Sequence, residues 1–210
     1  MANVVNNVET LTQTKTVVKQ KGKRIGILGG TFNPVHNGHL IVADQVLDQL
    51  GLDKVYLMPD ANPPHVERKF AIDAKDRVAM INCAIRDNPK FAIEMTEIMR
   101  GGVSYSYDTM KQLTQQHPEN QYYFIIGGDM VAYLPKWHRI DELVKFVSFV
   151  GVKRDGYTPS SKYPVIWVDV PYIDISSSLI RSKLRQHQSI KYLVPASVER
   201  YIKENHLYEK

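Results

Sequence analysis

A strand–glycine–helix pattern constrains the fold of this chain more than any other feature of its sequence. Residues 25–28 form a short apolar run that ends at Gly29 and Gly30. Such a run is typical of a buried parallel strand. Apolar residues then recur at three- and four-residue steps over residues 37–50, and Gly51 follows. This spacing predicts an amphipathic helix with a glycine stop, so the segment should fold as a strand, a glycine turn and a helix.

Two histidines, His36 and His39, lie at the predicted start of this helix, with Gly38 between them. Free N–H groups and the positive end of the helix dipole favour an anion there. Each imidazole can donate hydrogen bonds to phosphate, and each adds positive charge as imidazolium. We therefore predict a phosphate site here, where Gly38 lets a phosphate approach the backbone. Zinc ligation and a surface role remain alternatives, although no further ligand set with zinc spacing follows. The two glycines before the histidines could also form only a structural turn.

Strand and helix patterns alternate along the rest of the chain. Further strands are predicted at residues 54–59, 91–95, 121–126, 147–152 and 165–170. Further helices are predicted at residues 73–87, 104–116, 140–146, 178–186 and 196–205. This alternation predicts an α/β fold, a Rossmann-like doubly wound parallel sheet with helices on both faces. We expect a single domain over residues 24–210 and a polar, mobile extension over residues 1–23.

The composition limits the classes of function. The net charge is +5, but residues 1–24 hold five basic and one acidic residue, which gives +4, and the other 22 basic and 21 acidic residues give only +1. A nucleic-acid-binding face would need clustered basic residues on the folded body, so no nucleic-acid partner is expected. No apolar run approaches the roughly 18 residues of a membrane span, and no secretory signal is visible. We expect no membrane partner and a cytoplasmic location.

Two separate segments carry a resemblance to a known family. Residues 29–39, GGTFNPVHNGH, resemble the signature of the nucleotidyltransferase superfamily that carries a His-x-Gly-His element. Residues 175–181, ISSSLIR, are similar to the Ile-Ser-Ser-Thr-x-Ile-Arg element of the same superfamily. From about residue 24 onward, the chain resembles the bacterial nicotinate-nucleotide adenylyltransferases within it. The fold implied by this resemblance is the nucleotidyltransferase type of the Rossmann-like sheet.

Three positions differ from the family pattern. Asn33 replaces the Asp of many members, and asparagine keeps the turn-forming side chain without the charge. Ser178 replaces a threonine, so a hydroxyl is kept. Val66 replaces the lysine that usually follows the Pro-His pair, which is Pro64-His65 here, and His65 is either a ligand contact or a solvated loop residue. Either Arg68 or Lys69 takes the phosphate-facing role of that lysine, or the role is absent.

The resemblance implies transfer of the adenylyl group of ATP to nicotinate mononucleotide, which yields deamido-NAD and pyrophosphate in NAD biosynthesis. Mg²⁺ would arrive bound to ATP, without a protein metal site, and a homodimer is possible. The implied catalytic residues are His36, His39 and Arg181. The implied ATP-binding residues are Gly29, Gly30, Thr31, Phe32, Gly38, Gly127, Asp129, Ile175, Ser176, Ser177 and Ser178. The implied pyridine-nucleotide-binding residues are Ser104, Tyr105, Tyr107, Lys136 and Trp137.

Several of these residues have simpler interpretations. The indole of Trp137 could attract the cationic pyridine ring, or it could only anchor the packing. Ser104 or Ser106 could cap the helix in this segment, with Tyr105 and Tyr107 as packing residues. Alternatively, the start of that helix could bind the carboxylate of the pyridine ring. Asp129 could cap a short helix, bind a ribose hydroxyl or orient the metal-nucleotide. The serines at 176–178 could be helix caps alone.

Two alternative functions stay open. The first is a sister enzyme on the same scaffold with another acceptor, such as phosphopantetheine. The second is a non-enzymatic basic module, which would bind RNA in a strongly salt-dependent way. The enzyme interpretation makes one spatial demand: residues 36–39 and 176–181, distant in sequence, must converge on a shared polyphosphate pocket.

Overall fold

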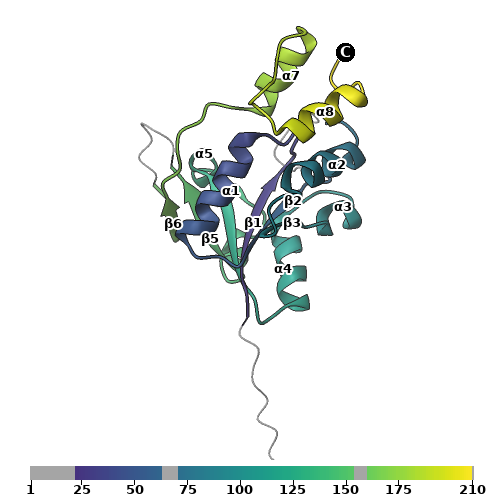
Figure 1. Ribbon diagram of the computed structural model, residues 1–210. Helices are drawn as coiled ribbons and strands as arrows, with labels where there is room; N and C mark the ends of the chain where they lie inside the picture. Colours follow the sequence, from purple (N-terminus) through teal and green to yellow (C-terminus); the bar gives the residue numbers. More distant parts are fainter. Residues whose placement is uncertain (1–21, 63–70, 154–159, 210) are drawn as a thin grey trace, which may run out of the picture.

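A six-stranded parallel sheet forms the centre of the protein (Figure 1). The computed structural model describes residues 22–62, 71–153 and 160–209. The strands are β1 (Arg24–Gly30), β2 (Lys54–Pro59), β3 (Phe91–Ile93), β4 (Gln121–Gly127), β5 (Val147–Val152) and β6 (Val165–Val168). Their order is β3-β2-β1-β4-β5-β6, and every adjacent pair is parallel. The order reverses between β1 and β4, the place where Rossmann-like sheets bind ligands at their carboxyl ends.

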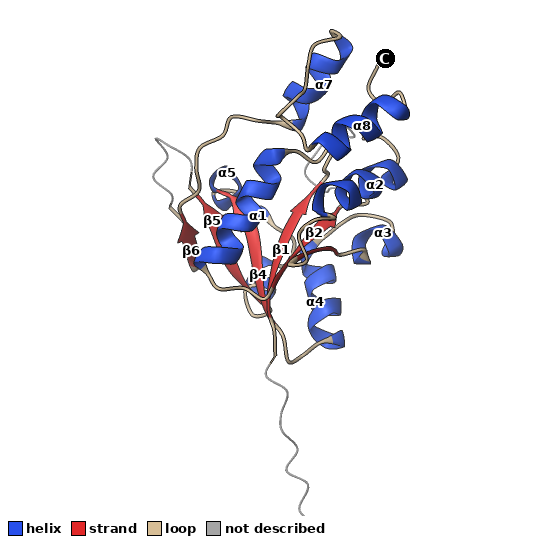
Figure 2. Cartoon of the chain, viewed as in Figure 1, coloured by secondary structure: helices blue, strands red, loops and turns tan. Residues whose placement is uncertain are grey.

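Helices cover both faces of the sheet (Figure 2). They are α1 (Asn37–Gln49), α2 (Ala74–Ile85), α3 (Thr96–Arg100), α4 (Ser106–Gln116), α5 (Gly128–Val131), the 3-10 helix η1 (Leu134–Lys136), α6 (Ile140–Leu143), α7 (Ser177–Arg185) and α8 (Ala196–Glu204). Side chains of α1, α2, α7 and α8 join one buried cluster, and those of α4, α5 and α6 join the other. The predicted doubly wound α/β sheet is therefore confirmed.

Several predicted boundaries are confirmed by local interactions. Asp73 caps α2, since its carboxylate accepts the backbone N–H of Lys75 at 2.8 Å. Gly51 follows α1 with φ +56°, the left-handed conformation that lets a glycine end a helix. Other boundaries differ: α4 begins at Ser106 instead of residue 104, and α6 is a single turn. The short helix α3 has no counterpart among the predicted elements, because five residues are too few to show a helical period.

The predicted glycine turn after the first strand is wrong in its position. Gly29 and Gly30 are still strand residues, paired with Met58 and Pro59, and neither has a positive φ. The chain turns at Phe32, which has φ +50° and is followed by the cis peptide bond between Asn33 and Pro34. The loop between β1 and α1 is therefore built by residues 31–36.

The C-terminal elements lie beyond the carboxyl ends of the strands, where α7 and α8 sit above β1 and α1 (Figure 1). Asn37 ties α1 to this region, since its backbone N–H donates to Leu193 O at 3.0 Å. Its side-chain amide also donates to Tyr192 O at 2.7 Å. The part of the chain after β6 thus lies over the end of the sheet that carries the histidine loop. Within the described residues, no helix is both long enough and apolar enough to cross a membrane.

Candidate active site

A cavity of about 540 Å³ opens at the carboxyl end of the sheet. Its floor is formed by the ends of β1, β2, β4 and β5, and one wall is the first turn of α1. A second wall comes from residues 170–177, which lead from β6 into α7. The cavity therefore lies where the strand order reverses, as the Rossmann-like topology predicts.

His36 and His39 both line this cavity. Their rings stack with centroids 3.6 Å apart and an interplanar angle of 24°. The backbone N–H of His36 donates to His39 Nδ1 at 3.2 Å. Because that nitrogen accepts a hydrogen bond, the neutral His39 ring carries its proton on Nε2, which can donate to a ligand. His36 Nδ1 is buried and makes no hydrogen bond of ordinary geometry, although the His36 side chain faces the backbone N–H of His39 in a capping-box arrangement.

Burial changes the charge that was predicted for these two histidines. Burial lowers the pKa of His36 to about 4. Burial also lowers the pKa of His39 well below its usual value of 6.5, and the neighbouring His36 lowers it further. Both rings are thus neutral at pH 7 when no ligand is bound. The prediction that each adds an imidazolium charge is wrong for the free protein, where they serve as neutral hydrogen-bonding groups.

The distant serine segment faces the same cavity. Ile175, Ser176 and Ser177 line it together with the two histidines and Gly38. Ser176 caps α7 by accepting the backbone N–H of Leu179 at 3.2 Å. Ser177 Oγ donates to Pro34 O at 2.8 Å, which joins α7 directly to the histidine loop. Residues 36–39 and 175–177 therefore meet in one cavity, so the spatial demand of the enzyme interpretation is met for these residues.

Arg181 and Ser178 lie beside the cavity and do not line it. Arg181 Nη1 donates to Asn33 O at 2.7 Å, and Nη2 donates to Ser178 Oγ at 3.1 Å. In the free protein the guanidinium therefore supports the histidine loop, and a contact with a phosphate would require it to leave these partners or to use its remaining N–H groups.

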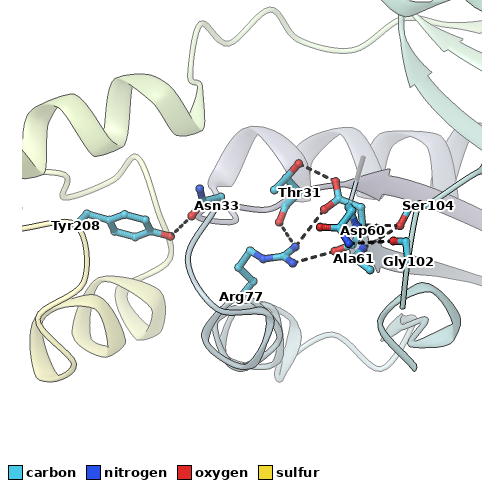
Figure 3. A network of polar contacts seen from close by, with 9 residues as sticks. Thr31, Asn33, Asp60, Ala61, Arg77, Gly102, Ser104 and Tyr208 are labelled. Carbon is cyan, nitrogen blue, oxygen red and sulfur yellow. Dashed lines mark hydrogen bonds and ion pairs between the residues drawn. The ribbon is translucent and has the colours of Figure 1, made fainter. Parts of the chain in front are cut away.

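A buried ion pair connects the ends of β1 and β2 (Figure 3). Arg77 of α2 donates to Thr31 O at 2.8 Å, to Asp60 O at 2.9 Å and to Asp60 Oδ1 at 3.4 Å. Thr31 Oγ1 donates to Asp60 Oδ2 at 2.7 Å, so the hydroxyl expected to bind ATP is used inside the protein. Burial raises the pKa of Asp60, and Thr31 and Arg77 oppose that rise. The sequence analysis did not predict this ion pair. Its one visible sign in the sequence is Asp60, directly after the predicted strand at residues 54–59.

A second buried carboxyl group, Glu97, lines the cavity from α3. Thr109 Oγ1 donates to Glu97 Oε1 at 3.0 Å. Burial raises the pKa of Glu97, opposed by hydrogen bonds from Ser104 and Thr109. Ser104 Oγ also accepts the backbone N–H of Ala61 at 2.9 Å, so it ties the loop after β2 to the start of α4. Ser104 lines the cavity but does not cap α4; Ser106, the first residue of α4, lines it as well. Sequence reasoning missed Glu97, which lies in the short helix α3.

Trp137 lies at the cavity with a packed ring. It meets Phe124 and Phe149 edge-on, with ring centroids 5.7 and 5.8 Å away. Its Nε1 atom is buried and has no hydrogen-bond partner. The side chain thus anchors packing and also lines the cavity, so both interpretations of Trp137 remain open.

The other expected pyridine-binding residues do not line the cavity. Tyr107 points into the core and donates from its hydroxyl to Glu142 at 3.2 Å. Tyr105 packs on the ring of His138 with centroids 4.4 Å apart. Lys136 is exposed, and its Nζ lies 5.1 Å from the centroid of the Tyr133 ring. None of these three side chains therefore faces the interior of the cavity.

The glycines expected to bind ATP, Gly29, Gly30, Gly38 and Gly127, all line the cavity. A Cβ atom at Gly38 would lie 3.1 Å from His36 Nδ1, and one at Gly127 would lie 2.6 Å from Asp129 Oδ1. A side chain at Gly38 would therefore press on the His36 ring, whereas one at Gly127 would displace the flexible carboxylate of Asp129.

Phe32 and Asp129 do not line the cavity. Phe32 is buried behind it, edge-on to His39, with ring centroids 4.9 Å apart. Asp129 is exposed, and the cap of α5 is Gly127 instead. His65, Arg68 and Lys69 lie outside the described residues. Within the described ranges, no group of three or more His, Cys, Asp or Glu side chains could hold a metal ion. The zinc interpretation of the two histidines therefore gains no third ligand there.

Comparison with known proteins places the chain in a family. Residues 27–183 match the model of the cytidylyltransferase-like family. The chain is 60% identical over 206 residues to a probable nicotinate-nucleotide adenylyltransferase of Lactiplantibacillus plantarum, covering 98% of both chains. It is 54% identical over 201 residues to a protein of the same name from Enterococcus faecalis, covering 96% of this chain and 92% of that protein.

Solved structures with lower sequence identity share the fold. The nicotinic acid mononucleotide adenylyltransferase of Plasmodium falciparum, complexed with NaAD, aligns with a TM-score of 0.75 and 20% identity, covering 89% of this chain and 98% of that one. The same enzyme complexed with APC aligns with a TM-score of 0.72. By its matching family model and its identity to these relatives, the chain belongs to the cytidylyltransferase-like family and, within it, to the nicotinate-nucleotide adenylyltransferases.

Proposed function

We propose that this protein transfers the adenylyl group of ATP to nicotinate mononucleotide, with the cavity at the end of the sheet as its active site. The observation that carries the proposal is the meeting of residues 36–39 with residues 175–177 in one cavity. The relatives that share 54–60% of its residues bear the name of this activity. In the reaction, a phosphate oxygen of the mononucleotide attacks the α-phosphorus of ATP, a new P–O bond forms, and the bond to pyrophosphate breaks.

The nucleophile belongs to the substrate, so the chain has to align two nucleotides and stabilise charge on the leaving pyrophosphate. We assign the triphosphate to the side of the cavity formed by His36, His39 and the start of α7. His39 Nε2–H would donate to a phosphate oxygen, since its Nδ1 is already occupied by a backbone N–H. The N–H groups in the first turn of α7 would add further donors.

Mg²⁺ would enter with ATP. The described residues contain no cluster of side chains that forms a dedicated metal site. We assign the ion to phosphate oxygens and several waters, because Mg²⁺ usually keeps much of its water shell in nucleotide sites. When bound, the ion offsets negative charge on the leaving pyrophosphate.

The pyridine nucleotide would occupy the opposite part of the cavity. That part is lined by Trp137, Ser106, Ser104 and Glu97. The unpaired Trp137 Nε1 and the first N–H groups of α4 are donors suited to the nicotinate carboxylate. The buried Glu97 is held by the hydroxyls of Ser104 and Thr109. It would stabilise this wall without contacting phosphate.

A pyrophosphate-release assay tests the proposal. The purified protein is mixed with ATP and Mg²⁺ and, in parallel, with nicotinate mononucleotide, nicotinamide mononucleotide or phosphopantetheine. We expect the fastest release with nicotinate mononucleotide and formation of deamido-NAD. Faster release with phosphopantetheine would assign the sister activity, and no release with any acceptor would refute an adenylyltransferase. The homodimer stays a prediction, which sedimentation velocity would test.

A further inference from the structure

The C-terminal end of the chain contacts the loop that presents the two histidines (Figure 3). The hydroxyl of Tyr208 donates to Asn33 Oδ1 at 2.7 Å, across 175 residues of sequence. Asn33 is only 5% exposed, so this contact is shielded from water. Burial raises the pKa of Tyr208 above its usual value, so the hydroxyl keeps its proton and remains a donor at neutral pH.

Three hydrogen bonds from the C-terminal part of the chain converge on two consecutive residues of this loop. Tyr208 binds the side chain of Asn33, and Arg181 donates to Asn33 O at 2.7 Å. Ser177 donates to Pro34 O at 2.8 Å. His36 lies two residues after Pro34, so these bonds hold the loop directly before the two histidines.

The backbone on both sides of the contact is unusual. Tyr208 has φ +67° and His206 has φ +49°, a region that residues with side chains rarely adopt. The reversal is closed by the N–H of Leu207, which donates to Ile202 O at 3.0 Å. Phe32, in the loop itself, has φ +50°. Such conformations persist where surrounding contacts hold them, and here the reversal after α8 turns Tyr208 back toward the loop.

We propose that Tyr208 is a positioning residue for adenylyl transfer: its hydrogen bond to Asn33 sets the loop geometry that places His36 and His39 against the triphosphate. This inference rests on the function proposed above for the cavity. Tyr208 itself does not line the cavity, so it acts through the loop. Misplacement of catalytic groups by about 1 Å can lower a rate by roughly 100-fold, so the loss of one remote hydroxyl should be visible in turnover.

The test compares Tyr208→Phe with a matched control, Tyr201→Phe. Tyr201 donates from its hydroxyl to Asp76 Oδ1 at 2.8 Å and joins α8 to α2 without touching the histidine loop. Both tyrosines pack on the same buried cluster. We expect Tyr208→Phe to lower kcat by about tenfold or more and Tyr201→Phe to lower it by less than about twofold. Similar decreases in Tm are expected for the two variants, since each loses one hydrogen bond.

Two further measurements separate positioning from stability. In ¹⁵N-edited NMR spectra of the histidine rings, Tyr208→Phe should shift the resonances of His36 and His39, and Tyr201→Phe should leave them unchanged. In the Asn33→Ala background, Tyr208→Phe should have little additional effect on kcat, because the acceptor is already gone.

The outcomes distinguish this inference from the proposed function. An inactive wild-type protein would refute the function. An active wild type in which the two tyrosine variants match in kcat and in histidine resonances would overturn the positioning role. A full Tyr208→Phe effect that persists in the Asn33→Ala background would also overturn it.

Discussion

Replacing Arg77 by methionine tests whether a buried ion pair fixes the floor of the cavity. Methionine keeps most of the apolar stem and removes the guanidinium. Three acceptors then lose their donor: Thr31 O at 2.8 Å, Asp60 O at 2.9 Å and Asp60 Oδ1 at 3.4 Å. The Arg77 side chain is 3% exposed and that of Asp60 is 12% exposed, so water replaces these bonds poorly. This substitution should therefore weaken the fold measurably.

Removing one partner of a buried ion pair costs about 3–5 kcal/mol. We expect the lower end, about 3 kcal/mol at pH 8, because Asp60 keeps its bond from Thr31. The pH dependence follows from the pKa of Asp60, which burial raises and Arg77 partly lowers. Without Arg77 this pKa rises further. A carboxyl group with a raised pKa in the folded state stabilises most at low pH, and this stability is lost as the pH rises through that pKa. The penalty of Arg77→Met should therefore be smaller at pH 5 than at pH 8.

Urea unfolding at pH 5 and pH 8 measures the free energy of unfolding for this variant and for wild type. Arg86→Met is the matched control, since Arg86 directly follows the same helix and makes only a 3.9 Å contact with Asp87 between side chains that are 72% and 97% exposed. The control should change stability by less than about 0.5 kcal/mol. A loss below about 1 kcal/mol for Arg77→Met, or an equal loss at both pH values, would refute the reasoning.

Three further predictions concern the cavity. His39→Ala should lower turnover by about 100-fold or more with a nearly unchanged melting curve; wild-type turnover would exclude its phosphate role. Binding of ATP should raise the pKa values of His36 and His39 from their lowered values, so an NMR titration of the histidine rings should show higher pKa values with ATP than without it, and unchanged values would contradict this. Trp137→Phe keeps the ring packing on Phe124 and Phe149 but removes Nε1–H, so it should weaken binding of nicotinate mononucleotide more than binding of ATP; equal effects would indicate packing alone.

The order of the strands and helices was predictable because each strand is a short apolar run and most helices show a clear period. β2 and β5 match the predicted ranges 54–59 and 147–152, and α1 matches its predicted start. The shorter helices were harder to predict from the sequence, since α3 has only five residues and α5 has only four. Such elements depend on contacts with the rest of the fold and leave no periodic pattern in the sequence.

The buried polar groups could not be predicted because their environment is created by tertiary packing. Arg77 lies in an amphipathic helix among other polar residues, and only the ends of β1 and β2 make it buried. Tyr208 lies 175 residues from its partner Asn33. Neither contact has a local sequence signature. The lowered pKa values of His36 and His39 likewise depend on burial by the folded loop.

At the pyridine-binding side, the start of α4 and the direction of its side chains differ from the prediction. The predicted helix began at residue 104, whereas α4 begins at Ser106. Tyr107 then lies on the face that carries Met110 and Leu113, and it packs into the buried cluster with them. Ser106 lines the cavity wall together with Ser104. Packing therefore determines which side chains of α4 face the cavity, and the sequence alone does not show this.

The most direct test of the central claim is a crystal structure of this protein with a non-hydrolysable ATP analogue and Mg²⁺. The claim is that two segments distant in sequence hold one triphosphate. We predict phosphate oxygens within hydrogen-bonding distance of His39 Nε2 on one side and of the N–H groups or hydroxyls of Ser176 and Ser177 on the other. A triphosphate bound away from either segment would contradict the claim.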